Sequence, residues 1–116
     1  MKIRYKLARI VNGKYLSANQ REREPYPPYC LEYEVGEVVE APNKGIACYK
    51  RRKNALTPLH IAETSDYFNN GEPIALLKLE AIGRSVWTSF SYRKGETYEG
   101  GINYGKVKVL EATTIK

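Results

Sequence analysis

The sequence is poor in the residues on which several classes of protein depend. Its 116 residues include one histidine and two cysteines, too few to supply the four ligands of a structural zinc site. Two cysteines also exclude a disulfide scaffold and favour a cytoplasmic chain with reduced thiols, although a single bridge between Cys30 and Cys48 stays open. The longest apolar run, Ile74 to Leu77, is too short for a membrane-spanning helix or a signal peptide. We therefore expect no metal, no cofactor and no membrane insertion.

The composition that remains is that of one compact domain over residues 1–116, with 42% apolar and 28% charged residues. The formal net charge is +6, from 19 Lys and Arg against 13 Asp and Glu. Residues 1–58 carry 12 basic and 6 acidic residues, whereas residues 59–116 carry 7 of each, so the first half holds the whole surplus. Its densest feature is the run Lys50-Arg51-Arg52-Lys53. Such a run attracts polyanions or an acidic partner protein, unless it is only a solvated turn.

Period-two alternation at the N-terminus predicts a strand with one buried face. Ile3, Tyr5 and Leu7 alternate with Lys2, Arg4 and Lys6, so the three cations are expected on the wet face. Asn12-Gly13 follows, the strongest short hairpin signal, because both residues tolerate positive φ. A second strand over residues 15–18 should therefore return antiparallel to the first.

The rest of the chain shows the same strand-rich pattern. The Pro-rich and charged residues 19–29 predict a surface loop, and residues 94–105 a glycine-rich loop. Alternation or β-branched content predicts further strands at 31–35 with a continuation at 38–39, and at 46–49, 74–82, 86–92 and 106–112. Of these, 74–82 has so few polar positions that burial on both faces is expected.

A single helix is predicted between Lys53 and Phe68. Its clearest start is Thr57 as N-cap with Pro58 at the first helical position, and Asn54 is an alternative start. Because hairpin signals dominate and only one helix exists, the sequence predicts an α+β fold. We expect a mainly antiparallel sheet of six or seven strands with one helix packed on one face.

Two patterns invite a catalytic or nucleotide-binding interpretation. Gly100 to Lys106 matches the spacing of a phosphate-binding loop, but Val107 stands where magnesium needs Ser or Thr, and too few residues follow for the required helix. Cys48 and His60 could form a nucleophilic pair, although Cys48 lies in an apolar strand where a free cysteine is usually a small hydrophobe. We assign no catalytic residue.

Tyrosine is the unusual residue, with ten copies against two Phe and one Trp. Tyr98 and Tyr104 fall in the glycine-rich loop, where no core is expected to cover them. Loop tyrosines beside arginines are typical of protein-binding surfaces, although they also pack back on their own domain. The predicted partner-binding residues combine the polar loop and the basic run: Arg21, Arg23, Tyr26, Tyr29, Lys50, Arg51, Arg52 and Lys53.

About half of the chain resembles small uncharacterised proteins encoded by phages and other mobile elements. The resemblance is carried by Tyr33 to Gly36, Gly45 to Tyr49, Asn54 to Leu56 and Leu79 to Gly83. It implies a compact α+β domain of viral or mobile-element origin, acting in the cytoplasm of a host cell, and it brings no assigned activity. Small domains of that origin often bind a host protein, as anti-CRISPR inhibitors do.

These observations lead to one main hypothesis and two alternatives. The main hypothesis is a non-enzymatic binding protein, an anti-defence inhibitor in the manner of anti-CRISPR proteins, that occludes a host protein's nucleic-acid or substrate site. The first alternative is an RNA or single-stranded DNA binding protein that uses the same basic face. The second is a small enzyme or nucleotide-ligand binder that uses Cys48, His60 and the glycine-rich segment.

Overall fold

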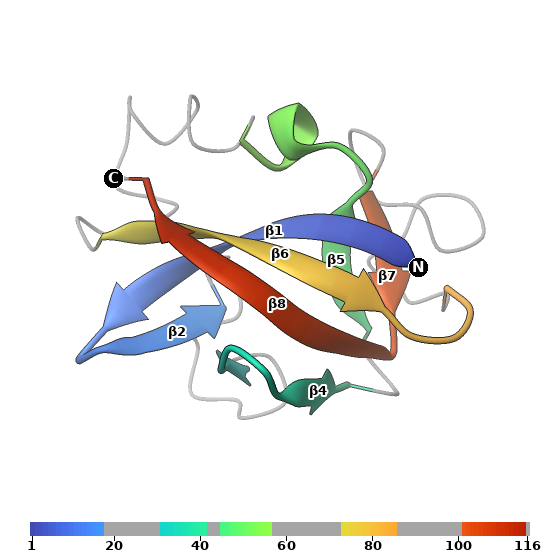
Figure 1. Cartoon of the computed structure of the whole chain (residues 1–116), viewed down its shortest axis with the longest axis horizontal. Coiled ribbons are helices and arrows are strands. Elements are labelled where there is room, and N and C mark those ends of the chain that lie inside the picture. Colours follow the sequence, from blue (N-terminus) through green and yellow to red (C-terminus); the bar gives the residue numbers. More distant parts are fainter. Residues whose placement is uncertain (18–30, 42–44, 57–72, 86–100, 116) are drawn as a thin grey trace.

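The computed structural model describes residues 1–17, 31–41, 45–56, 73–85 and 101–115 (Figure 1). In these ranges one helix occupies residues 52–56 and eight strands form one sheet. The strands are β1 (Lys2–Val11), β2 (Lys14–Ser17), β3 (Glu32–Tyr33), β4 (Val38–Glu40), β5 (Ile46–Tyr49), β6 (Ile74–Ala81), β7 (Gly101–Tyr104) and β8 (Lys106–Thr114).

The sheet is strongly curved. Its strand order is β3-β2-β1-β6-β8-β4, with β5 pairing β1 and β7, and all pairings among the described strands are antiparallel. The two ends of this path, β3 and β4, are separated in the chain only by residues 34–37. This turn is held against β8, because Gly36 N–H donates to the Val109 carbonyl at 2.8 Å and Val109 N–H donates to the Glu37 carbonyl at 3.0 Å. The curvature encloses one face of the sheet.

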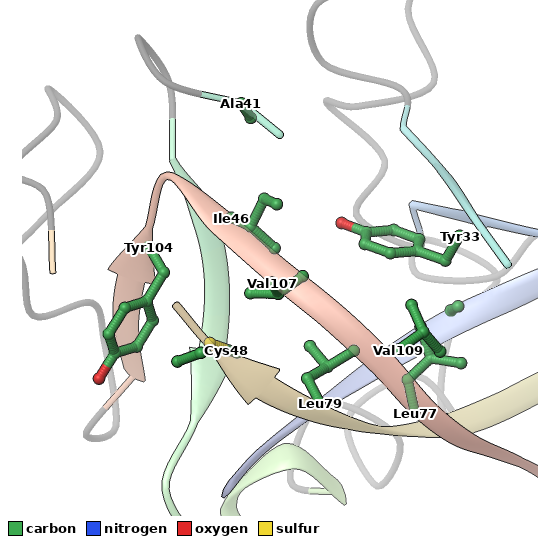
Figure 2. Close-up of a cluster of buried hydrophobic side chains, with 11 residues drawn as sticks. Tyr33, Ala41, Ile46, Cys48, Leu77, Leu79, Tyr104, Val107 and Val109 are labelled. Atoms are coloured by element: carbon green, nitrogen blue, oxygen red, sulfur yellow. The ribbon is translucent and has the colours of Figure 1, made fainter. Parts of the chain in front are cut away.

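The enclosed face carries the larger hydrophobic core, here called the inner cluster (Figure 2). Leu77 and Leu79 of β6 and Val107 and Val109 of β8 are completely buried in it, and the Tyr33 ring closes one side. The opposite face carries a smaller outer cluster of Leu7, Ala55, Ile74 and Leu76, in which Ala55 comes from the helix. The helix therefore packs on one face of a mainly antiparallel sheet, which confirms the predicted α+β arrangement. The predicted number of six or seven strands is wrong, because the described residues alone form eight.

Two predicted elements are confirmed in detail. Asn12 and Gly13 have φ values of 52° and 79° and join β1 to β2, with Val11 opposite Lys14. Strand β6 pairs β1 on one side and β8 on the other, and its side chains alternate between the inner and outer clusters. Its low polar content reflects burial on both faces.

Three predictions about individual elements are wrong. Val35 is 49% exposed and does not share the buried face of Tyr33, because the 34–37 turn ends β3 before it. A helix begins at residue 52, ahead of the alternative start at Asn54, since the Arg51 carbonyl accepts its first hydrogen bonds; the predicted start at Thr57 and the predicted helix from there to Phe68 lie outside the described residues. Part of the predicted glycine-rich loop is strand β7, which pairs along all of β5. The predicted 86–92 strand and the loop over residues 19–29 lie outside the described residues.

Candidate functional site

The basic run Lys50 to Lys53 lies where β5 ends and the helix begins, and all four residues are exposed. Its backbone is fixed: the Arg51 carbonyl accepts N–H groups of Asn54 and Ala55 at 3.1 and 3.2 Å. The buried Ala55 methyl then anchors the first helical turn in the outer cluster. Four cations therefore project from a segment whose position the core determines.

A second group of cations lies beside this run. Tyr5 pairs with Tyr49, and in an antiparallel pair the residue after Tyr49 runs back toward the residue before Tyr5. Arg4 directly precedes Tyr5 and Lys50 directly follows Tyr49, so the two cations flank this pair. Lys2, two residues further along β1, donates its ammonium to the Gly83 carbonyl at 2.8 Å, next to the exposed Arg84. The combined set is here called the basic surface: Lys2, Arg4, Lys50, Arg51, Arg52, Lys53 and Arg84.

Tyr104 contacts two cations of β1, Lys2 and Arg4. Its ring lies 6.0 Å from Lys2 Nζ and 5.5 Å from Arg4 Cζ, and its hydroxyl accepts a hydrogen bond from Arg4 Nε at 3.1 Å. Tyr104 is only 3% exposed and belongs to the inner cluster, so its predicted place in an uncovered loop is wrong. The cause is β7, which holds Tyr104 opposite Ile46 of β5.

Lys6 is buried, although the sequence predicts that it is exposed to solvent. Strand alternation places it with Lys2 and Arg4 on the predicted wet face, yet it is only 7% exposed. Strand β5 crosses this part of β1, and Lys6 Nζ donates to the Ala47 carbonyl at 3.0 Å. A buried ammonium needs such partners, so Lys6 is a structural cation and does not belong to the basic surface.

Negative charge gathers on a different part of the described chain. Glu32, Glu34, Glu37 and Glu40 all lie on the β3–β4 segment and are exposed. Lys14 pairs with Glu32 at 3.8 Å, and Lys106 pairs with Glu40 at 3.2 Å. Figure 1 shows β4 and the helix on opposite sides of the strands β1, β6 and β8. The basic run therefore lies on the other side of these strands from the four glutamates, two of which are paired with lysines.

A pocket of about 210 Å³ opens between the helix start and the outer face of the sheet. Arg52, at the start of the helix, forms one wall of the pocket, and residues of β1, β6 and β8 form its floor. Tyr5, Lys78 and Glu111 are direct neighbours across these three strands, and Leu76 and Thr113 form the next row. Lys78 Nζ and Glu111 Oε2 lie 3.8 Å apart. Sequence reasoning identified Arg52 but could not join it to residues so distant in the chain.

Cys48 does not have the properties of a nucleophile. Its side chain is completely buried in the inner cluster (Figure 2), and its Sγ lies 3.5 Å from the Ile102 carbonyl. Burial raises the pKa of the Cys48 thiol from 9.0 to about 12, against the smaller opposing effects of Lys6 and Arg4. Cys48 is a free thiol, so it is not bridged to Cys30. It behaves as the small hydrophobe that its apolar strand predicts.

Arg21, Arg23, Tyr26 and Tyr29 lie outside the described residues, as does His60. Across the described ranges, His, Cys, Asp and Glu side chains do not gather in any group of three or more that could hold a metal ion. Nor does that part of the chain contain a helix long and apolar enough to cross a membrane.

The described part of the Gly100 to Lys106 motif, residues 101–106, has the wrong conformation for a phosphate-binding loop. Gly101–Tyr104 is strand β7 and Lys106 is the first residue of β8, whereas a phosphate-binding loop leads from a strand into a helix. The sequence argument against this motif is confirmed. Comparison of the chain with protein-family models, curated proteins and solved structures found no match.

Proposed function

We propose that this protein is a non-enzymatic binding domain that docks on an acidic surface of a partner protein through its basic surface. The observation that carries the proposal is the exposed basic run on a backbone anchored by Ala55, continued by Arg4 and Lys2. Anchored cations lose less conformational freedom on binding than cations on a loose tail, so they favour specific recognition. The net charge of +6 would also speed the encounter with an acidic partner.

The charge of the basic surface limits what such a domain could block. A nucleic-acid channel is itself basic and would repel it, whereas a substrate or nucleic-acid site bordered by carboxylates would attract it. We therefore propose that the domain is an inhibitor of viral or mobile-element origin. It would bind the carboxylates that border a substrate or nucleic-acid site of the partner and block that site sterically. Cys48 supplies no chemistry in this proposal, because a buried neutral thiol cannot attack a substrate.

Affinity capture from a lysate of the source cell tests the proposal. The bait is compared with a variant that lacks three of the cations, Lys50→Gln, Arg51→Gln and Lys53→Gln, in nuclease-treated and untreated halves. A matched control removes three exposed lysines elsewhere, Lys14→Gln, Lys106→Gln and Lys108→Gln, and so has the same net charge.

We expect a discrete protein partner that survives nuclease treatment, is retained by the control and is lost with the first variant. Capture of nucleic acid without a stable protein would contradict the proposal and favour RNA or single-stranded DNA binding. Equal loss with both variants would also contradict it, because net charge and not the basic surface would then decide binding.

A further inference from the structure

The pocket beside Arg52 has a chemistry that the basic surface alone does not have. Among the described residues that line it are two cations, Arg52 and Lys78, and one carboxylate, Glu111, which together carry one net positive charge. The Lys78–Glu111 pair at 3.8 Å is long, and the two side chains are 41% and 69% exposed. A pair with this geometry contributes little to stability, so the Lys78 ammonium is available to a second anion.

The other walls of the pocket suit a short aliphatic chain. Tyr5 and Leu76 line it and also belong to the outer cluster or pack against it, and Thr113 adds a hydroxyl group that can donate. Tyr5, Lys78 and Glu111 are fixed relative to one another by the ladders between β1, β6 and β8. The pocket is thus built on regular sheet, with only Arg52 supplied from the helix.

We infer that this pocket receives the side-chain carboxylate of a glutamate or aspartate from the partner protein. The carboxylate would lie between Arg52 and Lys78, and its methylene groups would pack on Tyr5 and Leu76. This inference rests on the proposed function and assigns a defined subsite to it: the basic run steers the partner, and the pocket fixes one of its acidic residues.

Size distinguishes this occupant from a nucleotide. Pockets that hold drug-sized ligands or cofactors enclose roughly 300–1,000 Å³, and this one encloses about 210 Å³. A single side-chain carboxylate fits within this volume, whereas a whole nucleotide does not.

The test is an NMR titration of the full chain with N-acetyl-glutamate N-methylamide, whose side-chain carboxylate is its only charge. We expect shifts of the amide signals of Lys78, Glu111 and Thr113 with a dissociation constant in the millimolar range, typical of one charged contact. The neutral glutamine analogue should shift none of them. Equal shifts with both analogues, or larger shifts with uridine monophosphate, would overturn the inference.

Two variants should change the affinity for the glutamate analogue in opposite directions. Glu111→Gln raises the pocket's net charge by one and should tighten binding about threefold, and Arg52→Gln should weaken it by a similar factor. Glu37→Gln, on the exposed turn before β4, makes the same change in total charge and should leave binding unaltered. If Glu111→Gln and Glu37→Gln behave alike, the pocket is not the site.

Failure of this inference can be told apart from failure of the proposed function. Should the captured partner depend on Lys50, Arg51 and Lys53 while the glutamate analogue leaves the pocket signals unmoved, only the subsite is wrong. If the pocket binds the analogue but the partner is captured equally well without Lys50, Arg51 and Lys53, the docking proposal is wrong. The pocket would then bind a small free carboxylic acid.

Discussion

The Cys48 thiol should be chemically inert in the folded protein, and the structure gives the size of the effect. Burial raises its pKa from 9.0 to about 12, so the thiolate fraction near neutral pH falls about a thousandfold. Complete burial adds a second barrier, because the reagent cannot reach Sγ until the inner cluster opens. Only the thiolate attacks a disulfide reagent, so both effects slow the reaction.

The assay measures thiol release from an aromatic disulfide reagent in a Cys30→Ser variant, in which Cys48 is the sole thiol. We expect labelling at least a thousandfold slower in native buffer than in concentrated guanidinium chloride, where the thiol is free. A native rate within tenfold of the unfolded rate would refute the reasoning. It would also restore Cys48 as a candidate nucleophile.

The same pKa shift makes stability depend on pH in the alkaline range. The folded chain holds the Cys48 proton more tightly than the unfolded chain, whose thiol has a pKa of 9.0. The protonated thiol therefore makes its full contribution to the free energy of unfolding below about pH 9. This contribution falls by about 1.4 kcal/mol for each pH unit as the pH rises toward 12. Urea titrations of the parent and a Cys48→Ala variant should diverge in slope above pH 9.

Four further variants test the fold that positions the site. Leu77→Ala should lower the free energy of unfolding by about 3 kcal/mol, because it opens a cavity where the side chain is completely buried, whereas Val38→Ala at a 47% exposed position should cost less than about 0.5 kcal/mol in the same urea titration. Gly13→Ala should cost about 1 kcal/mol by thermal unfolding, since φ is 79° and no neighbouring atom lies within 4 Å of the added methyl; a loss above about 3 kcal/mol would contradict the turn geometry. Tyr104→Phe removes the acceptor of Arg4 Nε and should cost about 1 kcal/mol, and an unchanged urea midpoint would show that the hydrogen bond contributes nothing.

The sequence predicted the features that depend on neighbouring residues. Asn12-Gly13 specifies its hairpin locally, because both residues accept positive φ. The apolar content of β6 indicates burial on both faces wherever the partner strands come from. The basic run is predicted for a similar reason: four consecutive cations cannot all be buried.

The features that the sequence did not predict depend on contacts between distant segments. Alternation assigns Lys6 to the same face as Lys2, but only the crossing of β5 shows that this face is covered at Lys6. The glycines around Tyr104 indicate a loop, and pairing with β5 overrides that preference. The pocket needs the register of β1, β6 and β8 together with the helix start, so its residues carry no common sequence signal.

The affinity of the captured partner for three forms of this chain tests the central claim most directly. The three forms are the parent, the variant without Lys50, Arg51 and Lys53, and the control without Lys14, Lys106 and Lys108. The account predicts that the first variant binds about 30-fold more weakly, corresponding to about 2 kcal/mol for three exposed ion pairs, while the control stays within about threefold of the parent. Equal affinities of the parent and the first variant would show that the basic run takes no part in binding.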